Sequence, residues 1–154
     1  MIQIRKASER DASVASEILC ASIRDLCAEY HNNDPELVSR WIANKTPGHL
    51  ANWIANPQLA LFIAELDRRP AGIGCLSLDG EILLNYVAPA HRFCGISRAV
   101  LSHLEGYLAQ AGFSRGRLTS TKTAHRFYRR AAWLDFGEPE EMFGLVGYPM
   151  QKDM

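Results

Sequence analysis

Hydrophobic residues in the first third of the chain recur at steps of three and four, the period of an amphipathic helix with one buried face. This spacing predicts a helix that starts at the capping-box-like segment Ser8-x-x-Asp11 and runs to Tyr30. Pro35 is typical of the first turn of a second helix, and a third helix is predicted to end before Asn56-Pro57. A short strand, residues 2–5, precedes all three helices.

The pattern then changes to compact apolar runs separated by turn residues, which predict a three-stranded antiparallel meander. A long helix, a strand, a second helix and two closing strands follow it. The meander covers 59–66, 71–78 and 81–88, and the later elements cover 96–111, 117–120, 123–131, 133–136 and 142–150. The sequence therefore predicts an α/β fold, with a mixed sheet of six to seven strands flanked by helices on both faces.

Composition and charge limit the classes of function. The 154 residues suit one domain, and 17 basic residues balance 17 acidic ones, so no basic excess indicates a nucleic-acid or membrane-surface partner. Charges interrupt the N-terminus before a secretion signal, and no apolar run approaches the roughly 18 residues of a membrane span. Four cysteines without zinc-like spacing predict reduced thiols and no metal site. We expect a cytoplasmic protein.

The segment 87–97, which joins a strand to a helix, is the first candidate site. Unpaired amides and the positive end of the helix dipole bind anions, phosphates especially, at such a helix start. Gly95 allows a ligand to approach the backbone, Arg92 adds positive charge and Ser97 adds a hydroxyl donor. An ordinary strand-to-helix turn has the same features, so these residues alone leave the choice open.

Two motifs in this part of the chain resemble those of the GNAT N-acetyltransferase superfamily. The first, Tyr86-Val87-x-Pro89-x-x-Arg92-x-x-Gly95-Ile96-Ser97, is similar to the family's coenzyme A signature. The second, Ala124-x-x-Phe127-Tyr128-x-x-Ala131-Ala132-Trp133, is similar to its Ala-x-x-Phe-Tyr-x-x-x-Gly-Phe segment. Their order and interval suit the family, and so does the predicted order of elements. The resemblance implies a single GNAT domain over residues 1–154.

The resemblance also implies a reaction: transfer of an acetyl or other short acyl group from acetyl-CoA to a primary amine by direct attack in a ternary complex. Members of the family bind acyl-CoA in a V-shaped opening between two splayed parallel strands, which here would be 81–88 and 117–120. The implied cofactor-binding residues contact the pantetheine arm or the pyrophosphate: Val87, Arg92, Phe93, Cys94, Gly95, Ile96, Ser97 and Thr121.

Several positions depart from the family pattern. Phe93 and Ala132 stand where many members have glycine, and Cys94 stands where many have a basic residue. Ser97 replaces glycine or alanine, and Thr121 replaces asparagine. These departures leave a second interpretation open, in which the chain is a CoA-binding regulatory or interaction module that turns over no substrate.

Tyr128 and Glu81 are the catalytic residues that the resemblance implies. Tyr128 matches the family tyrosine that faces the CoA sulfur and would protonate the leaving thiolate; the alternative is a core tyrosine. Glu81 matches the glutamate that serves histone-type members as a general base; the alternative is a solvated carboxylate at a hairpin edge. Strand alternation predicts that Glu81 shares one face with Leu83, Asn85 and Val87.

The helical first third is the part that usually builds the acceptor pocket in this family. Tyr30 and His31 are the candidates there, with Asn85 on the strand side. His31 could contact the acceptor, act as an alternative base or be a polar loop residue, and Asn85 could orient a water or the acceptor or be structural. The partner implied is a small-molecule or peptide amine, and homodimerisation, common in the family, stays open.

Overall fold

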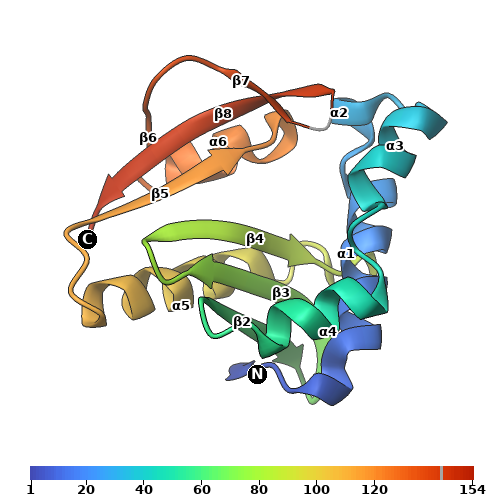
Figure 1. Ribbon diagram of the computed structural model, residues 1–154, viewed down its shortest axis with the longest axis horizontal. Helices are drawn as coiled ribbons and strands as arrows, with labels where there is room; N and C mark the ends of the chain where they lie inside the picture. Colours follow the sequence, from blue (N-terminus) through green and yellow to red (C-terminus); the bar gives the residue numbers. More distant parts are fainter. Residues whose placement is uncertain (143) are drawn as a thin grey trace.

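The computed structural model describes residues 1–142 and 144–154, and the backbone alone of Glu29. Its strands are β1 (Ile2–Lys6), β2 (Leu59–Leu66), β3 (Arg69–Ser77), β4 (Glu81–Val87), β5 (Arg115–Ser120), β6 (Leu134–Asp135), β7 (Glu140–Met142) and β8 (Leu145–Asp153). Its α-helices are α1 (Ala12–Leu26), α2 (Ala28–His31), α3 (Pro35–Ile42), α4 (Pro47–Ala55), α5 (Ile96–Gln110) and α6 (Lys122–Arg130) (Figure 1). Short 3₁₀ turns cover Glu9–Asp11 and Pro89–His91.

The strands form one mixed sheet in the order β1-β2-β3-β4-β5-β8-β6, with β7 paired to β8. Only β4 and β5 run parallel among the paired strands described, and α5 makes the crossover between them. The predicted α/β class and mixed sheet are therefore confirmed. The sheet has eight strands because the segment predicted as one closing strand, 142–150, is divided between β7 and β8, which pair as a hairpin.

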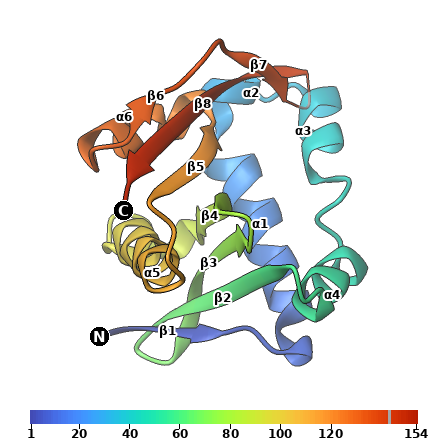
Figure 2. The same cartoon turned by 60° about the vertical axis from the view of Figure 1, so that its left-hand side comes forward.

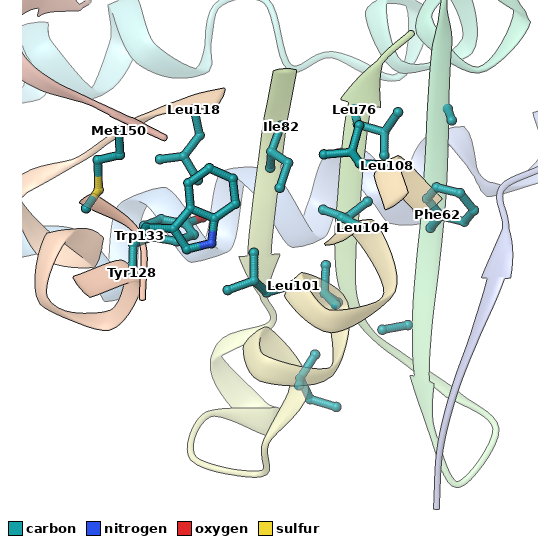
Figure 3. Close-up of a cluster of buried hydrophobic side chains, with 14 of the residues drawn as sticks. Phe62, Leu76, Ile82, Leu101, Leu104, Leu108, Leu118, Tyr128, Trp133 and Met150 are labelled. Carbon is teal, nitrogen blue, oxygen red and sulfur yellow. The ribbon is translucent and has the colours of Figure 1, made fainter. Parts of the chain in front are cut away.

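Helices cover both faces of the sheet, as predicted (Figure 2). On one face, leucines of α5 pack against β2, β3 and β4, and Tyr128 and Trp133 extend this core toward β5 and β8 (Figure 3). On the other face, α1 and α4 bury Leu19 and Leu50 against β2, β3 and β4. Among the described residues, no helix combines the length and the apolar character needed to cross a membrane.

The helix predicted to continue to Tyr30 is divided. Cys27 has φ and ψ of −108° and 19°, outside the helical region, and separates α1 from α2. Cys27 is buried with Ile23 and Trp41 in a small third core. The prediction of one continuous helix was therefore wrong, because packing against α3 turns the chain where the hydrophobic period alone would continue it.

Gly106 lies on the exposed side of α5, and a methyl group added there would meet no atom within 4 Å. Gly106→Ala is therefore expected to raise the free energy of unfolding by about 1 kcal/mol, the difference in helix propensity between the two residues. Urea denaturation would measure it. Gly74→Ala is the matched control, expected to destabilise, because its Cβ would lie 2.6 Å from a Val100 methyl. An unchanged midpoint for Gly106→Ala would contradict the prediction.

Candidate active site

The parallel strands β4 and β5 are joined at one end only. Their register contains two pairs, Glu81↔Arg117 and Ile82↔Leu118, after which the strands diverge (Figure 1). A cavity of about 140 Å³, called the cleft cavity below, lies between them. The predicted splayed pair is thus present. Beyond the two pairs, the facing backbone groups of each strand are left without the partners that a continuous sheet would supply.

A bulge in β4 decides which side chains face which helices. Leu76 of β3 pairs with Ile82, but the next residue back, Cys75, pairs with Leu84, so Leu83 is an extra residue. Past the bulge, Val87 faces the α5 core, as Ile82 does before it. The prediction that Glu81, Leu83, Asn85 and Val87 share one face was therefore wrong, because the extra residue reverses the alternation.

The loop before α5 has the conformation of an anion site. Gly95 caps the helix with φ of 81°, which glycine adopts without strain. The amide of Ala99 donates to the Gly95 carbonyl (3.1 Å), so the amides of the first turn, 96–98, precede the helical hydrogen bonds and point out of the helix end. They adjoin a cavity of about 340 Å³, the loop cavity, which Arg92 and Val87 also line.

The departures from the family pattern have distinct places in this loop. Phe93 is 91% exposed, and the Arg92 guanidinium lies 4.6 Å from its ring centroid, an arrangement that holds the cation at the loop. The exposed Cys94 thiol donates to the Arg92 carbonyl over 3.6 Å. Phe93 and Ala132 both have positive φ, 64° and 71°, which explains why glycine suits these two positions.

Tyr128 lies where the cleft and loop cavities meet, since it lines both. Thr121 fixes the first turn of its helix, α6, by accepting the Ala124 amide at 3.2 Å. The Tyr128 ring is 7% exposed and packs edge-on at 6.3 Å from Trp133 (Figure 3). Burial raises the pKa of Tyr128 to about 12, and a hydrogen bond with the Asn85 side chain opposes the rise. The phenol therefore stays protonated well above neutral pH.

Asn85 connects this tyrosine to α5. Its Nδ2 donates to the Ser97 carbonyl at 3.3 Å, while its Oδ1 is buried and accepts no hydrogen bond from any described residue. A buried amide oxygen without a donor is costly, so its presence favours a bound ligand that supplies an N–H. The first-turn amides of α5 and this oxygen together fit a ligand with both phosphate and amide groups, as coenzyme A has.

Glu81 lies at the closed end of the cleft, opposite Arg117. Burial raises the pKa of Glu81 above its ordinary value; the Arg117 charge opposes the rise, and Asp79 and Glu140 add to it. Glu81 is half-buried but is not among the residues that line the cavities described here. The arrangement suits a carboxylate that takes up a proton at a higher pH than a free glutamate.

A third cavity, of about 320 Å³, lies against β4 on the side of α3 and α4 and is called the side cavity below. It shares five residues with the cleft cavity: Leu83, Leu84, Tyr86, Thr119 and Thr121. Thr121 therefore lies toward this cavity rather than the loop cavity. The loop, cleft and side cavities form a series in which neighbouring cavities share lining residues, so a ligand held at the loop and another held in the side cavity would approach each other at the cleft.

Tyr30 and His31 do not line this series of cavities. The Tyr30 hydroxyl donates to the Val146 carbonyl. His31 is fully buried; its Nδ1 accepts the Asn33 amide (3.0 Å), so its Nε2 donates to the Ile23 carbonyl (2.7 Å). Both side chains thus have hydrogen-bond partners inside the protein. The helical period of the sequence could not show whether these side chains face the interior or a pocket.

The side cavity contains residues that sequence patterns did not single out. They come from four separated segments: Asn44 and Lys45, Leu59, Thr119, and Met142. Strand alternation on β5 was the one available signal, since Thr119 follows the buried Leu118 and so faces the other side. The others are brought together only by the fold.

Comparisons with known proteins agree with this geometry. The family model described as acetyltransferase (GNAT) domain matches residues 29–154. No curated protein matches the chain. A solved GCN5-related N-acetyltransferase from Rhodopseudomonas palustris is similar over 99% of this chain and 95% of its own, with 21% identity and a TM-score of 0.89.

Two further solved structures were determined with a cofactor. The PaiA N-acetyltransferase from Thermoplasma acidophilum, in complex with coenzyme A, matches over 100% of this chain and 99% of its own, with 20% identity and a TM-score of 0.82. YncA from Salmonella typhimurium, with acetyl-CoA, matches over 99% and 94%, with 17% identity and a TM-score of 0.72. At these identities the likeness establishes the fold.

Proposed function

The chain belongs to the GNAT acetyltransferase family, and on that premise we propose that it is an N-acetyltransferase that moves an acetyl or other short acyl group from CoA to a primary amine. Residues 1–154 would act as a single catalytic domain in the cytoplasm. The observation that carries the proposal is that Tyr128 and Asn85 line both the cleft cavity and the loop cavity, and that the side cavity adjoins the cleft cavity. The bound coenzyme A of the PaiA structure and the acetyl-CoA of YncA support the choice of co-substrate.

The loop cavity and the cleft cavity would each bind a different part of acetyl-CoA. The first-turn amides of α5 and Arg92 would hold the pyrophosphate, and the backbone of Val87 would bond the pantetheine arm in place of a paired strand. The Asn85 Oδ1 would accept an N–H of that arm. Bound acetyl-CoA supplies the thioester that the amine attacks directly.

The residues at the cleft would then carry out two proton transfers. As the new C–N bond forms and the C–S bond breaks, the Tyr128 hydroxyl donates toward the leaving sulfur, and Asn85 stabilises the charge left on the phenol oxygen. Glu81 takes the proton lost by the attacking amine, through a water, because it lies at the closed end of the cleft rather than in it. Positioning of the two substrates contributes the remainder of the rate.

The test combines binding and turnover. Calorimetry with CoA is expected to show one site, and acetyl-CoA with a panel of amines is expected to release free thiol that a colorimetric thiol reagent detects. CoA binding without thiol release for any amine would favour the alternative, a CoA-binding regulatory or interaction module, which the departures at Phe93 and Cys94 keep open.

Glu81→Gln tests the proposed base. We expect kcat/KM at neutral pH to fall by about a hundredfold, the usual contribution of a positioned base. In the wild type, Glu81 becomes protonated and stops acting as a base as the pH falls through its raised pKa. The acid limb of the pH profile of kcat/KM should therefore lie above the usual glutamate range. The variant should lack this limb.

Asp79→Asn is the control for Glu81→Gln. Removing the Asp79 charge, which raises the pKa of Glu81, should move the acid limb to lower pH with little change in the plateau rate. An acid limb that persists unchanged in Glu81→Gln would assign it to another group, such as the acceptor amine.

A further inference from the structure

The side cavity is compact and mostly apolar. Its walls include Trp41, Trp53, Leu59 and Met142, and its volume of about 320 Å³ is near the lower end for small-molecule sites. Trp41 is 1% exposed and its ring packs edge-on at 5.4 Å from the Tyr30 ring, so this wall is fixed rather than adaptable. Such a cavity holds the body of one small molecule rather than an extended chain.

The described lining of the side cavity contains one charged residue, Lys45, and no carboxylate. Lys45 is 4% exposed, and its ammonium donates to Asn44 Oδ1 at 2.6 Å. Burial lowers the pKa of Lys45 to about 8, which still leaves it mostly protonated at neutral pH. A second ammonium carried into this mostly apolar cavity would lose its hydration, and no carboxylate among these lining residues would pair with it.

The rim has the opposite charge. Glu140 is exposed and accepts the Thr119 hydroxyl at 3.2 Å, just outside the cavity. A flexible acceptor with two amines could place one of them there, in water. Because an exposed ion pair contributes little, this contact would not offset the apolar contacts that the acceptor gives up when its second amine leaves the cavity.

We propose that the acceptor is a compact monoamine whose amino group is carried on an apolar or aromatic body, and that diamines, polyamines and lysine-containing peptides are poor acceptors. The proposal rests on the N-acetyltransferase function proposed above. The apolar body fills the side cavity against Trp53 and Leu59, while the amino group reaches the cleft past Tyr86 and Thr121, which line both spaces.

Pentylamine and 1,5-diaminopentane form a matched pair, because they share a five-carbon chain and differ by one amino group. With acetyl-CoA, kcat/KM from thiol release is expected to be at least about tenfold higher for pentylamine, and phenethylamine should resemble pentylamine. Equal or better turnover of the diamine, or of a lysine-containing tripeptide, would overturn the proposal. Loss of such a diamine preference in Glu140→Gln would assign the acceptor site to the rim.

Leu83→Glu tests the charge argument without a buried substitution. Leu83 is 43% exposed and lines the cavity, so a carboxylate there should reduce the preference for pentylamine by at least about tenfold. Leu78→Glu is the matched control, because Leu78 is 40% exposed and lies in the hairpin away from the cavity. Comparable changes in both variants would contradict the assignment of the side cavity.

A binding measurement separates this proposal from the enzymatic one. Trp41 and Trp53 line the side cavity, so their fluorescence should report amine binding in the presence of CoA even if no thiol is released. Pentylamine is expected to bind at least about tenfold more tightly than the diamine. Tighter diamine binding would overturn the acceptor class, whereas absent turnover with the expected binding order would overturn only the catalytic function.

Discussion

Gly95→Val is expected to lower the affinity for acetyl-CoA by about a hundredfold. The φ of Gly95 is 81°, a conformation that a β-branched residue strongly disfavours, so valine should pull the loop away from its present path. The amides that follow it would then miss the phosphates. Losing two hydrogen bonds to a charged group costs about 3 kcal/mol, which corresponds to that factor. Calorimetric titration with CoA measures it directly.

Gly112→Val is the matched control for this substitution. Gly112 ends α5 with φ of 91°, and a Cβ there meets no atom within 4 Å; at Gly95 the nearest atom is 3.9 Å away. Both variants should therefore lose similar stability through the backbone alone, but Gly112→Val should retain CoA affinity. Unchanged affinity in Gly95→Val would remove the loop from the CoA site.

Tyr128→Phe is expected to lower kcat by about a hundredfold and to change acetyl-CoA affinity by less than about twofold, because the hydroxyl acts on the leaving sulfur and not on the ground state. The pKa of about 12 predicts that the wild type keeps this acid form at pH 9 and that no basic limb from Tyr128 lies below about pH 11. Tyr107→Phe, on α5 against Phe62, is the control. An unaffected rate with a chemistry-limited acceptor would contradict the role of Tyr128.

Asn85 should act through the same phenol. Asn85→Leu removes the amide that bonds both the Ser97 carbonyl and Tyr128, so it should slow turnover on its own. In the Tyr128→Phe background the further loss of kcat at saturating acetyl-CoA should be small, because the effects of residues that act on one group are not additive. Additive effects of the two substitutions would separate Asn85 from the proton transfer.

The sequence allowed the elements and the loop to be predicted because both depend on local chemistry. Periodicity predicted β2 with its observed bounds, and the glycine before an amphipathic helix predicted the loop that caps α5. The role of this loop in binding CoA came from the family resemblance and stays a prediction. The bulge at Leu83 could not be predicted, since an extra residue in a ladder depends on the partner strand. It places Asn85 and Glu81 on opposite faces of the strand, where regular alternation would have placed them on one.

The acceptor side was least predictable for the same reason. The side cavity is built from residues far apart in the chain, such as Lys45 and Met142, whose proximity follows from the strand order and the helix packing. His31, a polar residue after a predicted helix, was a candidate for contact with the acceptor, but α2 places its side chain in the protein interior. A histidine that satisfies two backbone groups and one that meets a substrate have the same sequence signature.

The short contact between β4 and β5 means that this sheet has two edges inside the molecule in addition to its outer ones. Any exposed edge can recruit a foreign strand, so each of these inner edges is a risk for misassembly during folding. The bulge at Leu83 and the proline that closes β4, Pro89, interrupt the regular ladder that such a strand would need. The devices that open the cleft to a ligand thus also keep it from being closed by another chain.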